Sequence, residues 1–153
     1  MINLTGSYLF QANRRDVWPL IFDPNSLVQL IPGCQQLIQI NENEYKGIIQ
    51  VGIASVSGVY ETYVRIVQAI PEEYCHLHGE VIGGTGTING EAKFNLSDNG
   101  DRAFLLYEGE ALITGALATL NPRFLVGVIQ TLIRLGFVVF DRKLNNEREH
   151  VNQ

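Results

Sequence analysis

The chain has 153 residues, a formal net charge of −5 and only 18% charged residues. This length predicts a single domain over residues 1–153 with a sizeable core, and we expect a flexible tail from about residue 146. Because the balance is acidic and no basic run precedes the C-terminal tail, we exclude nucleic acid as a partner and membrane binding by charge alone. The low share of charge indicates surface that is buried, lines a cavity or meets partners.

The N-terminus and the cysteines indicate the compartment. The first ten residues, MINLTGSYLF, alternate like a strand and have neither the charged leader nor the cleavage site of a secretory signal. Cys34 and Cys75 are too few for a disulfide framework, and no metal-ligand spacing surrounds them. We therefore expect a cytoplasmic protein with buried or inert thiols and no metal site.

Hydropathy periodicity separates a short helical region from a long alternating one. A first strand is predicted over residues 2–11, and two short helices over 14–22 and from 24 to 30, the first of them capped by Asn13. Alternating segments follow, separated by turn-forming residues such as those at 41–44 and 97–100. These strands are predicted at 35–40, 45–53, 59–70, 74–82, 87–96 and 102–113.

The most apolar run in the sequence lies from Asn121 to Asp141. Asn121 suits a helix cap and Pro122 the first helical position. At about 100° per residue, the run has one broad apolar side and a narrow polar seam. The apolar side carries Phe124, Leu125, Val128, Ile129, Leu132, Leu135, Val139 and Phe140, and the seam carries Arg123, Gln130, Arg134 and Asp141. Because charges on the seam disfavour a membrane span, we expect a soluble helix with a thin solvated edge.

The order of strand, two short helices, six strands and a long helix predicts an antiparallel sheet, because no βαβ alternation occurs. A helix with so broad an apolar side needs a surface that wraps it. We therefore predict an α+β fold in which a curved, seven-stranded antiparallel sheet wraps around the long C-terminal helix. The short helices form an apolar elbow with inward residues Trp18, Ile21, Phe22, Leu27 and Leu30, of which Trp18, Leu27 and Leu30 are the candidate gate.

The segment VWPLIFDPNSLVQLIPGC, from Val17 to Cys34, resembles the CoxG family, the G subunits of carbon monoxide dehydrogenase. The features that carry the resemblance are a Val-Trp pair, an Asp-Pro pair six residues after its valine, and an Ile-Pro-Gly-Cys at matching separations. The similarity covers nearly the whole chain, through Gly86, Gly90-Glu91-Ala92, Leu105, Tyr107, Gly115-Ala116-Leu117-Ala118 and Arg123. It implies the START-like helix-grip fold of the SRPBCC superfamily.

The sequence shows no catalytic constellation. His76 and His78 lie on one face of a predicted strand, but no further metal ligand is placed near them, so exposed histidines are favoured. Glu108 and Glu110 share a strand face that we interpret as solvated. The glycines at 83–86 lack the lysine and the strand-to-helix context of a phosphate loop. We therefore expect a protein that is not an enzyme.

Small residues on the predicted inward faces favour a cavity between sheet and helix, although sheet curvature and close helix packing also account for them. An apolar ligand suits such walls, and three tyrosines offer hydroxyls to orient its polar end. The candidate lining is Tyr45, Ile49, Tyr60, Val64, Leu77, Ile88, Gly90, Tyr107, Phe124, Val128 and Leu132. Each of these residues also fits an ordinary core.

The resemblance implies a protein that assists maturation or membrane recruitment of a molybdenum hydroxylase or carbon monoxide dehydrogenase. With the cavity, it favours binding of a quinone or lipid, no other cofactor, and peripheral contact with the inner face of a membrane. One alternative is a polyketide cyclase- or dehydratase-like enzyme, which needs an inward acid or base. Another is a ligand-free adaptor, or a homodimer, that uses the outer sheet face near Phe104, Leu106 and Leu112.

Overall fold

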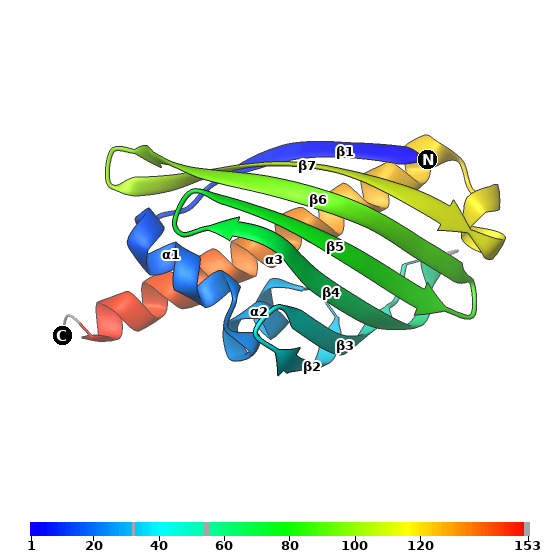
Figure 1. The fold of residues 1–153 in the computed structure, drawn as a ribbon, viewed down its shortest axis with the longest axis horizontal. Coiled ribbons are helices and arrows are strands. Elements are labelled where there is room, and N and C mark those ends of the chain that lie inside the picture. Colours follow the sequence, from blue (N-terminus) through cyan, green and yellow to red (C-terminus); the bar gives the residue numbers. More distant parts are fainter. Residues whose placement is uncertain (32, 54–55, 152–153) are drawn as a thin grey trace.

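The structure is a computed structural model that describes residues 1–31, 33–53 and 56–151, without the side chains of residues 30 and 147–151. Figure 1 shows one curved sheet with the C-terminal helix running across one of its faces. The elements are β1 (Ile2–Leu9), α1 (Arg14–Ile21), α2 (Pro24–Leu30), β2 (Cys34–Asn41), β3 (Glu44–Val51), β4 (Gly58–Ile70), β5 (Tyr74–Gly83), β6 (Gly86–Asn99), β7 (Arg102–Thr114), the 3-10 helix η2 (Gly115–Thr119) and α3 (Pro122–Val151).

The seven strands form a single antiparallel sheet in the order β1-β7-β6-β5-β4-β3-β2. Strands β2 to β7 are each paired with their sequence neighbour, and β1 joins the sheet beside β7, with Ile2 opposite Ala111. This arrangement confirms the predicted α+β helix-grip fold, including the two short helices after the first strand. The 3-10 helix η2 was not predicted, because five residues are too few to show a period.

Alternation along each strand separates an inner face from an outer face. In β7, Ala103, Leu105 and Ala111 are buried on the inner side. Leu106 and Leu112 point outward and are 52% and 51% exposed. The outward placement predicted for these two leucines is therefore confirmed, and the period of two explains it.

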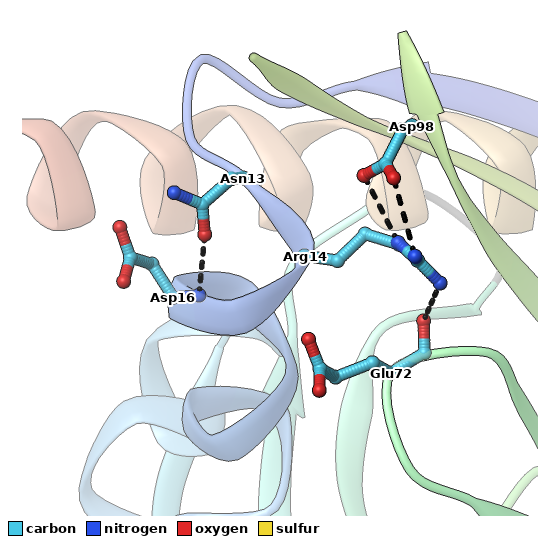
Figure 2. A network of polar contacts seen from close by, with 5 residues as sticks. All are labelled: Asn13, Arg14, Asp16, Glu72 and Asp98. Carbon is cyan, nitrogen blue, oxygen red and sulfur yellow. Dashed lines mark hydrogen bonds and ion pairs between the residues drawn. The ribbon is translucent and has the colours of Figure 1, made fainter. Parts of the chain in front are cut away.

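Polar side chains fix the start of α1 beside the strand ends of β6 and β4 (Figure 2). Asn13 caps the helix by accepting a hydrogen bond from the backbone N–H of Asp16 at 2.9 Å. Arg14 donates through Nε and Nη2 to the carboxylate of Asp98 at 3.0 and 3.2 Å, and through Nη1 to the carbonyl of Glu72 at 3.0 Å. These bonds join α1 to the end of β6 and to the β4–β5 turn.

Two apolar clusters fill the space between the sheet and the helices. One cluster packs α1 against the C-terminal part of α3 and includes Phe10, Val17 and Phe140. The other surrounds η2 and the N-terminal part of α3, where Leu117 and Leu125 are buried. The first cluster is dense with aromatic pairs, such as Phe10 with Phe140 at 5.8 Å between ring centroids. The second borders a cavity.

The long helix differs from the prediction in length and in orientation. Its backbone continues to Val151, past the point near residue 146 where we expected a tail. Three residues of the predicted apolar side, Phe124, Leu135 and Val139, are 42%, 50% and 44% exposed, because the sheet covers a narrower strip than the helix offers. Asp141, placed on the solvated seam, is instead 5% exposed. Hydrogen bonds from Tyr8 of β1 and from Gln11, just after β1, compensate its burial.

Candidate ligand cavity

A cavity of about 480 Å³ lies between the inner face of the sheet and α3, and it is partly open to solvent. Pockets for small molecules commonly range from about 300 to 1,000 Å³, so this one can hold a small ligand. Its lining is Leu4, Ile31, Ile49, Val51, Val56, Tyr60, Leu77, Val81, Ile88, Ala111, Leu117, Leu125, Val128, Ile129, Leu132, Ile133 and Phe137. All of these side chains are apolar except the hydroxyl of Tyr60.

The inward positions of neighbouring strands build the sheet side of the cavity. Leu77 and Val81 lie on the same face of β5, and Val81 is opposite Ile88 of β6. Because side chains on one face of a strand recur every second residue, these three point toward α3. Gly79, between Leu77 and Val81, leaves open space: an added Cβ would meet no atom closer than 3.8 Å.

Six residues of the predicted lining lie on the cavity wall: Ile49, Tyr60, Leu77, Ile88, Val128 and Leu132. Five do not: Tyr45, Val64, Gly90, Tyr107 and Phe124. Phe124 is partly exposed, because the sheet covers a narrower strip of α3 than its apolar side offers. Tyr107 lies against Gly6 of β1 and beside Phe137, outside the cavity.

Gly90 has a different role from the one predicted. A Cβ at this position would stand 2.9 Å from the Cα of Ala111 and would also meet the carbonyl oxygen of Glu110. Such distances are shorter than van der Waals contact, so a side chain would push β6 and β7 apart. Gly90 therefore permits close approach of two strands, a role that differs both from cavity lining and from the close helix packing given as the alternative.

The prediction missed eleven lining residues, and two reasons account for five of them. Val51, Val81 and Ala111 have the same strand parity as predicted residues, so extending the alternation would have found them. Val56 and Leu117 lie outside the regular strands and helices, where hydropathy has no period to show which side faces inward. The others are Leu4, Ile31, Leu125, Ile129, Ile133 and Phe137.

The inner tyrosine hydroxyls are engaged with the protein itself. Tyr60 donates to the carbonyl of Val56 at 2.6 Å and lies 2.7 Å from the hydroxyl of Thr85, which is then the donor of that pair. Tyr45 donates to the carbonyl of Phe22 at 2.6 Å, and burial raises the pKa of its phenol. These bonds hold segments of the fold together, so Tyr45 and Tyr60 donate their hydroxyl protons within the protein. Orientation of a ligand by the three tyrosines stays a prediction.

The predicted gate residues lie outside the cavity wall where the structure describes them. Trp18 packs against Phe22 with 4.7 Å between ring centroids and against Phe94 at 6.1 Å. Leu27 is partly buried, and the side chain of Leu30 lies outside the described residues. Ile31, directly after α2, does reach the wall. Gating by the elbow stays a prediction.

The two strand histidines lie on the outer face of the sheet. Nε2 of His76 is 3.0 Å from Oε2 of Glu91, and Nδ1 of His78 is 3.8 Å from Oε1 of the same residue. The hydrogen bond from His76 is the main cause of a lowered pKa of Glu91. These groups point away from the cavity, and the described cavity lining contains no acid or base. In the described part of the chain, no cluster of three His, Cys, Asp or Glu residues could hold a metal ion.

A model of the CoxG family, described as the G subunit of carbon monoxide dehydrogenase, matches residues 6–145. The chain belongs to this family. A solved structure of a conserved protein from Geobacillus kaustophilus is 30% identical, with 95% of this chain and 96% of that chain covered and a TM-score of 0.90. No curated protein sequence matches the chain.

More distant structures share the fold of this CoxG family member. A START superfamily protein from Mycobacterium smegmatis has a TM-score of 0.71 at 10% identity, over 94% of this chain and 97% of that one. The di-domain ARO/CYC StfQ from the steffimycin biosynthetic pathway has a TM-score of 0.69 at 11% identity, over 97% of this chain and 52% of that one. At these identities the likeness shows the START-like fold alone.

The exposed side of α3 combines apolar and basic residues. Over Pro122–Asn146 the helix is long and apolar enough to cross a membrane, and 22% of its most apolar stretch is buried. Core helices of soluble proteins meet the same criterion, and this helix packs on the sheet. Its cationic residues in that range, Arg123, Arg134, Arg142 and Lys143, are all exposed, whereas its one acidic residue there, Asp141, is buried. We define the exposed side of α3 by Phe124, Leu135, Val139 and these four cations. This side is therefore positively charged.

Proposed function

We propose that this CoxG family member is a non-catalytic carrier that holds the apolar tail of a quinone or lipid in the cavity. The observation that carries the proposal is the cavity of about 480 Å³, whose described lining side chains are apolar apart from one engaged hydroxyl. An enzyme active site would need polar side chains directed at the reacting atoms of a substrate, and the described wall offers none.

Burial of apolar surface supplies the binding free energy in this proposal. Each buried methylene contributes about 0.8 kcal/mol, so a ten-carbon tail gains roughly 8 kcal/mol before the losses of translational, rotational and chain freedom. A ligand with a tail would bind and one without it would not.

The exposed side of α3 supports loading at a membrane surface. A helix with apolar residues and cations on one side binds at the interface of an anionic bilayer, where a basic residue contributes about 1 kcal/mol. The chain as a whole has a net charge of −5, but the exposed charged residues of α3 over Pro122–Asn146 are all cations. We place the protein in the cytoplasm, at the inner face of a membrane.

Membership of the CoxG family supports a link to carbon monoxide dehydrogenase. In this part of the proposal, the protein assists maturation or membrane recruitment of that enzyme or of a related molybdenum hydroxylase. An apolar carrier that visits the membrane would serve such a partner by bringing a membrane-soluble molecule to a soluble enzyme.

Native mass spectrometry of the purified protein, with organic extraction of bound material, tests the carrier function. The protein is measured as isolated and after incubation with decylubiquinone or with dioleoylphosphatidylglycerol. We expect a one-to-one complex with at least one of them. A protein that is empty as isolated and stays empty after both incubations would overturn the proposal.

A matched pair of variants on β5 links binding to the cavity. Val81 lines the cavity, and its neighbour Ile82 points to the outer face and is 41% exposed. We expect Val81→Trp to weaken binding at least about tenfold, or about 1.4 kcal/mol, and Ile82→Trp to leave it unchanged. Val81→Phe is the smaller step if the tryptophan prevents folding, which circular dichroism reports. Equal binding by folded Val81→Trp would exclude the cavity as the site.

The outer sheet face supports an adaptor as the second candidate function. Leu106 and Leu112 are about half exposed on β7, and under this alternative a partner protein would cover them. Under this alternative, Leu106→Lys abolishes association, measured by light scattering and by pull-down with carbon monoxide dehydrogenase, and leaves quinone binding intact. Association that is indifferent to Leu106→Lys would exclude it.

A further inference from the structure

The described residues of the cavity wall present no free side-chain donor to the polar head of a ligand. Among the described lining residues, the only polar side-chain group is the Tyr60 hydroxyl. Its proton is donated to Val56, and it accepts a hydrogen bond from Thr85, so both of its ordinary roles are used. The nearby Tyr45 hydroxyl is likewise committed to Phe22. The side chains of the described lining can therefore offer apolar contact but no free hydrogen-bond donor.

A polar head inside this wall would lose its hydrogen bonds to water without replacement. Burial of an amide or hydroxyl without a partner costs roughly 2–7 kcal/mol, depending on the reference state. A tail in the same place gains free energy with every methylene. The lowest free energy therefore has the tail inside and the head at the opening, where water remains its partner.

We propose that this CoxG family member recognises its ligand by the tail alone, and so binds the oxidised and reduced forms of one quinone with nearly equal affinity. This inference rests on the proposed carrier function and deepens it. Reduction of a quinone adds two protons and two electrons and turns both ring carbonyls into hydroxyls, while the tail is unchanged. A head that stays in water meets the same surroundings in either form.

Discrimination requires a complementary polar group, as enzymes illustrate. Sites that hydrogen-bond a ligand hydroxyl reject the analogue lacking it by about 10⁴ to 10⁵, whereas apolar pockets discriminate by about 10² or less. Equal affinity has a functional consequence. The protein could deliver one redox form and carry the other back, because the head does not bias the exchange.

The experiment compares decylubiquinone with decylubiquinol, which share one ten-carbon tail, and with ubiquinone-0, which has the same ring and no tail. Dissociation constants are measured by anaerobic titration calorimetry, with the quinol kept reduced by dithionite. We expect the two decyl compounds to agree within about threefold, since their tails are identical and their heads stay in water. Ubiquinone-0 should show no binding at the concentrations that saturate with the decyl compounds.

The outcomes separate this inference from the carrier function on which it rests. A difference of about tenfold or more between the two decyl compounds would overturn tail-only recognition while leaving the carrier function standing. Binding of ubiquinone-0 as tight as that of decylubiquinone would also overturn it. Failure of both decyl compounds and of dioleoylphosphatidylglycerol to bind would instead overturn the carrier function. In Val81→Trp, affinity for both redox forms should fall by the same factor.

Discussion

The carboxylate of Asp141, on the C-terminal part of α3, accepts a hydrogen bond from the backbone N–H of Gln11 at 3.0 Å. The same carboxylate lies 3.2 Å from the Tyr8 hydroxyl and 3.2 Å from the side-chain amide of Asn145, both of which donate to it. Residues 130 positions apart are thus joined at the end of β1. This contact fixes the C-terminal part of α3 beside the end of β1. The helix so positioned forms one wall of the cavity.

Asp141→Asn should lower the free energy of unfolding by about 1–3 kcal/mol, because an amide accepts fewer hydrogen bonds and one buried donor loses its partner. Urea denaturation measures the change. Asp101→Asn, in the exposed β6–β7 turn, is the control and should change stability by less than about 0.5 kcal/mol. Equal stabilities of the two variants would show that the Asp141 contacts contribute nothing net.

Gly90→Ala and Gly127→Ala should have opposite effects on stability. The new methyl group at Gly90 would collide with the backbone of β7, at a cost of roughly 1–3 kcal/mol. At Gly127, on the exposed side of α3, it would meet no atom within 4 Å. Alanine is the better helix former there by about 0.5–1 kcal/mol, so the protein should become more stable. Thermal unfolding of both variants checks the signs, and a stabilised Gly90→Ala would contradict the close approach of β6 and β7.

Cys75 should make the protein sensitive to alkali. The thiol is fully buried, and burial raises its pKa from 9.0 to about 11. Below pH 9 the thiol is protonated in both states and its contribution to stability is complete. Between pH 9 and 11 the unfolded chain loses the proton first, so the free energy of unfolding falls as pH rises.

Cys75→Ala isolates this effect, because the buried tyrosines titrate in both proteins and their contributions cancel. The stability difference between the wild type and Cys75→Ala, from urea denaturation at several pH values, should be constant up to about pH 8.5 and shrink toward about pH 11. A difference that stays constant over the whole range would show that the thiol ionises equally in the folded and unfolded chain.

Reversing two charges on the exposed side of α3 should release the protein from anionic membranes. Arg134→Glu with Arg142→Glu should lower the affinity for phosphatidylglycerol vesicles by roughly tenfold or more, since each basic residue near such a surface contributes about 1 kcal/mol. Lys46→Glu with Arg65→Glu makes the same change of net charge on the sheet, at exposed positions of β3 and β4. Vesicle flotation measures binding, and equal loss in both pairs would indicate net charge alone.

Every strand was predictable in kind and within a few residues, because strand period and turn residues are local properties. The segment predicted at 59–70 is β4, Gly58–Ile70, and that at 102–113 is β7, Arg102–Thr114. Once the strands were known to be consecutive, the antiparallel sheet followed, because neighbours joined by short turns pair that way. Six of the eleven predicted lining residues were also correct, since residues such as Leu77 and Ile88 take their direction from strand parity.

The sequence by itself therefore determined the element order, the fold class and the apolar character of the interior. The tertiary structure alone decided which strip of α3 faces the sheet, since hydropathy measures how much of a helix is apolar and not how much its partner covers. Phe124 is exposed and Asp141 buried for that reason. It also decided that Tyr45 and Tyr60 bond to backbone carbonyls, because the partners of a hydroxyl depend on segments that meet only in the folded chain.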